Sequence, residues 1–295
     1  MTDPRPIGIF DSGVGGLTVL REIIRRTPLE PTLYLGDNDR APYGTRSDDE
    51  VLAFSTQSLD ALVERDVKAL VVACNTSTAV GLAAFRQRYD LPVLGVVRPG
   101  AAAAALATRN GRVGVIATPA TIRSHAYLDA IKVENPGVNV VEHATPALVP
   151  MVEAGELTGP TARATLAASL APLLAGSESG SAVSGSSRAG GDDDSRPPAD
   201  AIDTLLLGCT HYPLLRPLFV DLLGDDVAIV DSATATASAL AELLSVNRLE
   251  TPAGTTPSHV QMTTGDPGRF EAVAGRLFGP AFVSVEAVEL GALAR

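Results

Sequence analysis

Short runs of apolar residues, each followed by a polar loop or a helical pattern, make up most of this chain. Ala69 to Val72 and Leu205 to Leu207 are apolar throughout, without the alternation of a half-exposed strand. Such runs are typical of parallel strands that helices cover on both faces. Amphipathic stretches such as Asp48 to Glu64 lie between them and predict helices. The pattern predicts an α/β protein with mainly parallel sheets flanked by helices.

The order of these elements occurs twice along the chain. Ile7 to Ser12 and Val113 to Thr118 are both strands with a glycine at the second position and a hydroxyl residue at the end. In each half, a later apolar strand leads through one small residue to a cysteine, first Cys74 and then Cys209. The sequence therefore predicts two similar α/β lobes with the active site in the cleft between them.

The predicted lobes have defined boundaries. The first lobe is expected to comprise residues 1–97 plus 212–295, and the second residues 98–211. Residues 176–200 interrupt the second half and are rich in Gly, Ser, Ala and Asp, with no apolar periodicity. Such a composition cannot bury enough apolar surface to order itself, so we expect a disordered insertion there. Without it, the interval from strand end to cysteine is nearly equal in the two halves.

The composition and charge of the chain limit which molecules it can bind and in which cellular compartment it is expected. The formal net charge of −11 over 295 residues opposes binding to nucleic acid and to anionic membranes. Residues 1–6 contain no apolar core of a signal peptide, and the apolar stretch Ala101 to Ala107 is too short to span a bilayer. Two cysteines without an export signal indicate reduced thiols, so we expect a cytoplasmic protein.

The positions of the two cysteines carry the main chemical signal. Each lies at the carboxyl end of a buried strand, where open α/β sheets bind ligands, and each precedes a helix whose N-terminus favours a thiolate. Two thiols on opposite faces of a carbon centre can remove a proton from one face and return it to the other. The polar residues that follow them can hydrogen-bond the carboxylate and ammonium groups of an amino acid: Asn75, Thr76, Thr210 and His211.

Other interpretations of these residues remain open at this point. A cysteine in an apolar strand is most often an inert core residue. A redox pair is less attractive because the chain contains no C-x-x-C sequence. The four histidines show no paired spacing for a metal, so no metal site is expected. His211 by itself is also compatible with a helix-capping role.

Two loops near the N-terminus have the composition of a binding site. The turn Asp11 to Gly16 joins a strand to a helix, and its glycines allow an anion to approach the helix N-terminus. A tight turn capped by Ser12 explains the same residues. The loop Gly36 to Thr45 is polar and long for a simple connection, which is typical of a loop that lines a site.

Four ordered motifs resemble those of the glutamate racemase family, within the wider aspartate/glutamate racemase superfamily. They are F-D-S-G-V-G-G-L-T-V, Y-L-G-D-x-x-x-x-P-Y-G, A-C-N-T and G-C-T-H-Y-P, and the resemblance runs from about Ile7 to Leu244 except for the insertion. It implies an isomerase that interconverts L- and D-glutamate without a cofactor and supplies D-glutamate for peptidoglycan. It also implies a two-lobed fold, commonly dimeric.

The resemblance also implies roles for particular residues. Cys74 and Cys209 would be the two acid/base residues, and Asp11 and His211 would each assist proton transfer at the neighbouring thiol. Glu153 is a weaker third candidate. The substrate site would be lined by Asp11, Ser12, Tyr43, Gly44, Asn75, Thr76, Thr210 and His211. Residues 176–200 depart from the family pattern, which leaves their role undefined.

Two alternative functions remain. An aspartate racemase or a decarboxylase is the nearest enzyme alternative, although the resemblance implies that the decarboxylases keep only one of the two cysteines. A non-catalytic amino-acid-binding or regulatory protein belongs to a different class. The presence of both thiols argues against it, because binding alone requires neither.

Overall fold

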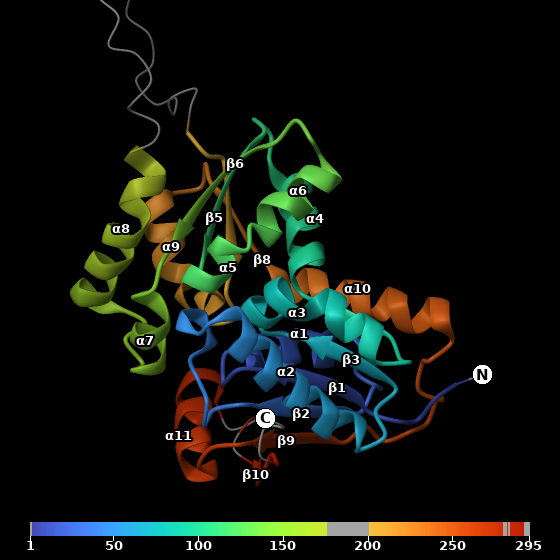
Figure 1. Cartoon of the computed structure of the whole chain (residues 1–295). Helices are drawn as coiled ribbons and strands as arrows, with labels where there is room; N and C mark the ends of the chain where they lie inside the picture. Colours follow the sequence, from blue (N-terminus) through green and yellow to red (C-terminus); the bar gives the residue numbers. More distant parts are fainter. Residues whose placement is uncertain (1, 176–200, 280–281, 283, 292–295) are drawn as a thin grey trace, which may run out of the picture.

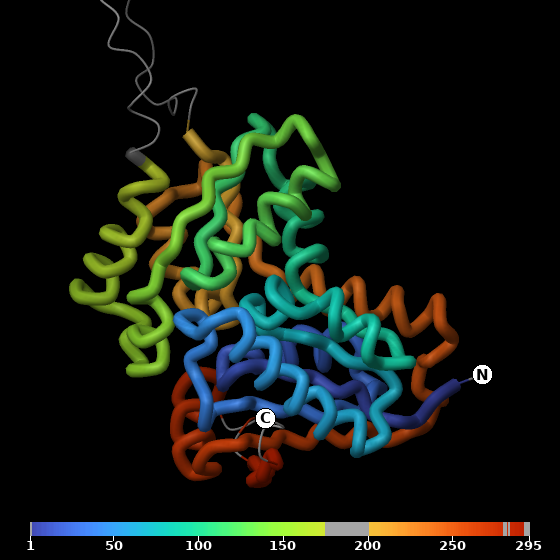
Figure 2. Tube along the Cα trace, viewed as in Figure 1, coloured from blue at the N-terminus to red at the C-terminus, as the bar shows by residue number. Residues whose placement is uncertain are grey.

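The computed structural model describes residues 2–175, 201–279, 282 and 284–291, which form two α/β lobes (Figure 1). The predicted insertion at 176–200 lies outside the described residues. The chain begins and ends in the same lobe, as the blue and red ends of the tube in Figure 2 show. No helix in the described part of the chain is both long enough and apolar enough to cross a membrane.

The first lobe contains a six-stranded sheet in which every pairing is parallel, with the order β10-β9-β2-β1-β3-β4. Its strands are β1 (Ile7–Asp11), β2 (Thr32–Gly36), β3 (Ala69–Val72), β4 (Val93–Gly95), β9 (His259–Thr263) and β10 (Glu286–Ala287). The flanking helices are α1 (Leu17–Arg26), α2 (Asp48–Val63), α3 (Asn75–Arg88), α10 (Ser232–Asn247) and α11 (Pro267–Phe278), with the 3₁₀ turn η1 (Tyr43–Thr45). All residues of β1, β2 and β3 are buried, as the continuous apolar runs predicted.

The second lobe contains a four-stranded parallel sheet with the order β6-β5-β7-β8. Its strands are β5 (Arg112–Ala117), β6 (Asn139–Ala144), β7 (Thr204–Gly208) and β8 (Ala228–Asp231). Its helices are α4 (Val97–Ala107), α5 (Pro119–Arg123), α6 (Ala126–Glu134), α7 (Leu148–Glu153), α8 (Gly159–Ala175) and α9 (Arg216–Leu223), with the 3₁₀ turn η2 (Tyr212–Leu215).

The two sheets share one strand order. Strands β2-β1-β3-β4 of the first lobe correspond in sequence to β6-β5-β7-β8 of the second, and Cys74 and Cys209 follow the equivalent strands β3 and β7. The first sheet is then extended by β9 and β10 from the end of the chain. The predicted fold class, with two similar lobes of parallel strands flanked by helices, is confirmed.

The predicted return to the first lobe at residue 212 differs from the structure. Strand β8 pairs in parallel with β7, and Phe219 of α9 is buried in the same core as Leu205 and Leu207. The chain re-enters the first lobe only at α10. The repeated unit extends one helical segment and one strand beyond each cysteine, whereas the sequence comparison stopped at the cysteines. Strand β8 stays with β7 because Ile229 and Val230 pack against the cores of the second lobe.

The chain crosses between the lobes twice, and both crossings lie on one side of the molecule. The first leads from β4 into α4 and the second from β8 into α10, and these two helices pack against each other (Figure 1). On the opposite side, α7 of the second lobe faces α11 of the first (Figure 1). The carboxyl ends of β1, β3, β5 and β7 lie between these two sides.

Candidate active site

Both cysteines line one small pocket between the lobes. The pocket is a cavity of about 30 Å³, which has room for about one or two water molecules. Cys74 and Cys209 are 5% and 6% exposed. The lining residues come from both lobes and are Ser12, Gly13, Ala41, Pro42, Tyr43, Gly44, Cys74, Asn75, Thr76, Thr118, Val149, Glu153, Cys209, Thr210 and His211.

Cys74 is held in the protonated form. It caps the N-terminus of α3, where its Sγ accepts a hydrogen bond from the Ser77 N–H at 3.4 Å, and its thiol donates to Ser12 Oγ at 3.5 Å. Burial, and then the nearby carboxylate of Asp11, raise the pKa of Cys74 to about 11, although its hydrogen bonds with Ser77 and Ser12 oppose the shift. The helix N-terminus favours a thiolate here, but burial outweighs this effect and favours the thiol of Cys74 at neutral pH.

Cys209 has a different environment. Its Sγ lies 3.8 Å from Nδ1 of His211, and Nε2 of the same ring lies 3.1 Å from Oε1 of Glu153. Burial opposes a charge on His211, but the contacts with Cys209 and Glu153 outweigh it and raise the pKa of His211 to about 10. The hydrogen bond from His211 lowers the pKa of Glu153 in turn. At neutral pH the pair is therefore imidazolium and carboxylate, beside the Cys209 sulfur.

Asp11 supports the glycine-rich turn from beneath and is not among the residues that line the pocket. Its carboxylate is fully buried, where Oδ2 accepts the N–H groups of Gly13 and Gly16, both at 3.0 Å, and Oδ1 accepts the Thr210 hydroxyl at 3.5 Å. Burial raises the pKa of Asp11. The sequence predicted Asp11 as a lining residue, whereas the structure places it under the turn; Ser12, the predicted turn cap, faces Cys74 instead.

Gly15 allows the close approach of the two lobes at this turn. A Cβ atom at position 15 would lie 2.5 Å from both the His211 ring and the Thr210 hydroxyl, so no other residue fits without displacing them. Thr18, one turn further along, donates a hydrogen bond to the Thr210 carbonyl at 3.0 Å. The glycine-rich turn therefore packs against the segment that follows Cys209. This packing accounts for Gly15 without an anion site.

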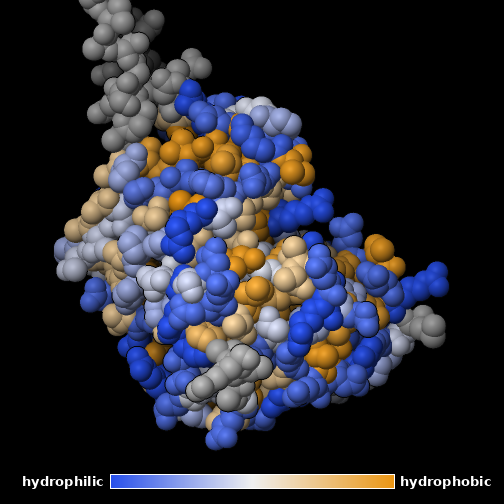
Figure 3. All heavy atoms as spheres, viewed as in Figure 1, coloured by the Kyte–Doolittle hydropathy of each residue, from blue (hydrophilic) through white to orange (hydrophobic). Residues whose placement is uncertain are grey.

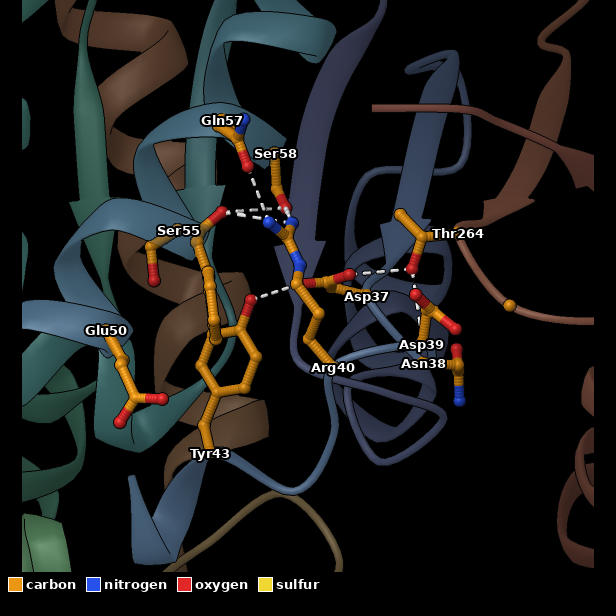
Figure 4. A network of polar contacts seen from close by, with 12 residues as sticks. Asp37, Asn38, Asp39, Arg40, Tyr43, Glu50, Ser55, Gln57, Ser58 and Thr264 are labelled. Atoms are coloured by element: carbon orange, nitrogen blue, oxygen red, sulfur yellow. Dashed lines mark hydrogen bonds and ion pairs between the residues drawn. The ribbon is translucent and has the colours of Figure 1, made fainter. Parts of the chain in front are cut away.

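Tyr43 is a lining residue of the pocket, and its hydroxyl takes part in the polar network around Asp37 (Figure 4). The phenol donates to Oδ2 of Asp37, a fully buried carboxylate that also accepts Arg40 Nε at 2.7 Å and Thr264 Oγ1 at 2.6 Å. Burial, followed by the charge of Asp37, raises the pKa of Tyr43. The phenol is therefore a structural donor, and the Tyr43–Gly44 segment faces the pocket through its backbone and ring.

Polar groups on the remaining wall include one free acceptor. The Asn75 side chain donates through Nδ2 to Tyr127 Oη at 2.6 Å, and its Oδ1 is buried without a hydrogen-bond partner among the described residues. Thr76 Oγ1 lies 2.9 Å from Thr118 Oγ1, which in turn lies 3.0 Å from Thr121 Oγ1. An orphaned buried oxygen is costly, so a donor from a bound molecule would stabilise Asn75.

Five lining residues are absent from the predicted site residues. Gly13, Ala41 and Pro42 lie within the two loops that the sequence indicated as binding loops, whereas Thr118 and Val149 lie outside them. Thr118 follows the first strand of the second lobe, as Ser12 follows the first strand of the first lobe, so the duplication was the signal that could have identified it. Val149 lies on α7 and has no such signal. Within the described part of the chain, no three His, Cys, Asp or Glu side chains are arranged to hold a metal ion.

A comparison with known protein families identifies the family of this chain. The family described as Asp/Glu/Hydantoin racemase matches residues 7–180. Together with the full-length relatives below, this match shows that the chain belongs to the Asp/Glu/Hydantoin racemase family, and within it to the branch of the glutamate racemases.

The full-length relatives are as follows. A glutamate racemase of Geobacter metallireducens is 44% identical over 288 residues, which cover 98% of each chain. The crystal structure of a glutamate racemase from Bacillus anthracis superposes with a TM-score of 0.85 at 40% identity, covering 97% of this chain and 98% of that one. That of the Francisella tularensis enzyme, in complex with D-glutamate, gives a TM-score of 0.82 at 31% identity and covers 98% of both chains.

Proposed function

We propose that this protein interconverts L- and D-glutamate by a two-base mechanism in which Cys209 and Cys74 act on opposite faces of the α-carbon. The observation that carries the proposal is the pocket itself. It receives one thiol from the end of β3 in the first lobe and one from the end of β7 in the second. The similarity to glutamate racemases of Geobacter metallireducens and Bacillus anthracis supports glutamate as the substrate.

Substrate binding is assigned to the polar groups around the two thiols. Asn75 lines the pocket, and its Oδ1 is a buried acceptor without a partner among the described residues, which suits the ammonium group of an amino acid. The hydroxyls of Ser12, Thr76 and Thr118 and the backbone of Tyr43–Gly44 supply donors for the two carboxylates. The His211 imidazolium adds a positive charge on the side of Cys209, which offsets the charge that develops as the α-proton leaves.

The proton steps follow from the positions of the two cysteines. With L-glutamate bound, Cys209 acts as the base and takes the α-proton, and the electron pair passes into the α-carboxylate. The Cys74 thiol then donates its proton to the opposite face and forms D-glutamate. In the reverse direction the Cys74 thiol must first lose its proton, and Cys209 must carry one.

The remaining predictions about biological context are proposals of the same kind. D-glutamate would be supplied for peptidoglycan synthesis in the cytoplasm, with no cofactor. Assembly as a homodimer also remains a prediction. Large exposed apolar side chains lie on separate elements, such as Leu106 on α4 and Val246 on α10, and the hydrophobic residues on the face in Figure 3 form separate patches. These side chains therefore do not point to one particular dimer interface.

The test uses the dialysed full-length protein without pyridoxal phosphate. L-Glutamate and L-aspartate are supplied separately, and the optical rotation of each is followed. Loss of rotation with L-glutamate supports the proposal, and loss only with L-aspartate assigns the alternative aspartate racemase. Stable rotation with both, under conditions where the protein binds glutamate, would instead identify the non-catalytic amino-acid-binding alternative.

A further inference from the structure

The contacts around Cys209 continue beyond Glu153 into the other lobe. Glu153 is the last residue of α7, and its backbone carbonyl accepts a hydrogen bond from Nη2 of Arg276 on α11. Helix α11 belongs to the first lobe, where Phe270 and Ala274 are buried in the core against β1 and α1. The Arg276–Glu153 contact therefore joins the lobes on the side opposite to their two chain crossings (Figure 1).

Arg276 also packs closely against the backbone at the end of α7, in addition to forming this hydrogen bond. Gly155, two residues after Glu153, has φ +81°, and a Cβ atom there would lie 2.8 Å from Arg276 Nε and 3.0 Å from its Cδ. The guanidinium thus lies against bare backbone at the helix C-terminus. The last carbonyls of a helix lack partners within the helix and carry partial negative charge, which a cation stabilises.

The Glu153 side chain depends on this backbone position. It is 39% exposed, so packing alone does not fix its carboxylate opposite His211 Nε2. The chain of contacts runs from Arg276 through the Glu153 backbone and carboxylate to His211, and from His211 to the Cys209 sulfur. The hydrogen-bond partners of Cys74, which are Ser12 and Ser77, come from the first lobe and involve no part of α7.

We propose that Arg276 is a positioning residue for the Cys209 half of the reaction, because it holds the end of α7 where the Glu153 carboxylate meets His211. The inference rests on the two-cysteine function proposed above and adds to it an asymmetry. Deprotonation of L-glutamate depends on a contact between α7 and α11, and deprotonation of D-glutamate does not.

The experiment measures the two half-reactions separately in full-length Arg276→Met and Arg276→Lys variants. A glutamate analogue with a leaving group on Cβ eliminates after α-deprotonation and needs no second base. Misplacement of a reacting group by about 1 Å costs up to about a hundredfold, so turnover of the L-analogue should fall by about tenfold or more in Arg276→Met. Turnover of the D-analogue should stay within about twofold. Lysine keeps a donor and should restore part of the loss.

Arg88→Met provides a matched control. Arg88 is an exposed arginine of α3 that pairs with Asp60 and lies away from the pocket, so its replacement should alter neither half-reaction. Since Arg276 is also exposed, both variants should keep the native fold, which circular dichroism checks.

The pH profile of the L-analogue gives a second readout. The titratable groups around His211 are Cys209, Glu153 and Asp11, and Arg269 lies close enough to Glu153 to act on its carboxylate. In Arg276→Met the Glu153 carboxylate should lie farther from His211, which should lower the pKa of His211. The pH above which turnover of the L-analogue falls should then be lower than in the wild-type protein, whereas the pH profile of the D-analogue should not change. Equal losses for both enantiomers, or no loss for either, would overturn the inference. Wild-type protein that eliminates neither analogue would instead overturn the proposed function.

Discussion

His211 Nε2 lies 3.1 Å from Oε1 of Glu153, and this contact makes the surroundings of the two cysteines unequal. The histidine that Glu153 supports touches Cys209, whereas Cys74 has only neutral hydroxyl and amide partners at hydrogen-bond distance. The two lobes share one strand order and place a thiol at the end of the equivalent strand, but the two thiols have different hydrogen-bond partners. The predictions below use this asymmetry.

Each cysteine should serve one enantiomer. Serine in place of cysteine is far less acidic and a poor base at neutral pH, so each single variant should lose most racemase activity. With the eliminating analogue, Cys74→Ser should still process the L-form through Cys209, and Cys209→Ser should process only the D-form. Product release from the two analogues can be followed in parallel. If both variants treated the two enantiomers alike, the assignment of opposed bases would be wrong.

Neutralising Glu153 should lower the upper pH limit of the L-directed reaction. The pKa of His211 is raised to about 10, in part by Glu153, so Glu153→Gln should lower it and discharge the imidazolium at a lower pH. The alkaline limb of kcat/KM for L-glutamate should move toward neutrality. Asp60→Asn, which removes a carboxylate remote from the pocket, serves as the control and should leave that limb unchanged.

The same pair predicts how stability depends on pH. Because the pKa of His211 is higher in the folded protein than its ordinary value near 6.5, the stabilisation is complete below about 6.5 and is lost as the pH rises through about 10. Thermal unfolding from pH 6 to 10 should show a falling Tm in the wild-type protein. In Glu153→Gln the fall should be smaller and should end at a lower pH. A steeper fall in the variant would contradict the assigned contact.

Removing the hydroxyl of Tyr43 should weaken substrate binding more than turnover. Tyr43→Phe leaves the buried Asp37 carboxylate without one donor, which costs about 1–3 kcal/mol of stability and loosens the Tyr43–Gly44 wall of the pocket. KM for both enantiomers should rise more than kcat falls. Tyr89→Phe is a matched control, since Tyr89 donates to Asp60 outside the pocket. A change in KM in the control variant of equal size would argue against the specific role of Tyr43.

Removal of residues 176–200 should leave turnover largely intact. The prediction rests on their composition, which lacks the apolar residues needed for a packed core. A deletion that joins the end of α8 to residue 201 by a short turn can be compared with the full chain in steady-state assays. A folded variant that loses most of its activity would show that the segment contributes to the site or to assembly.

The sequence by itself determined that the chain forms two similar α/β lobes with parallel strands, and that each lobe places a cysteine at the end of a buried strand. The reason is local: continuous apolar runs such as those of β3 and β7 are buried on both faces, which makes them central parallel strands. The carboxyl ends of parallel strands share one edge of a sheet, so Cys74, Asn75 and Thr76 lie at that edge of the first sheet, and Cys209, Thr210 and His211 lie at that edge of the second. The two edges line one pocket because the folded lobes bring them together.

Only the tertiary structure decided where side chains in loops and between lobes point. Asp11 lies under a turn, the Tyr43 phenol points to Asp37 and residues 212–231 stay with the second lobe, and none of these follows from hydrophobic periodicity. The Arg276–Glu153 contact joins residues 123 positions apart on an exposed rim. Such contacts depend on how two folded lobes come together, and a sequence pattern with a period of two or 3.6 residues carries no information about that arrangement.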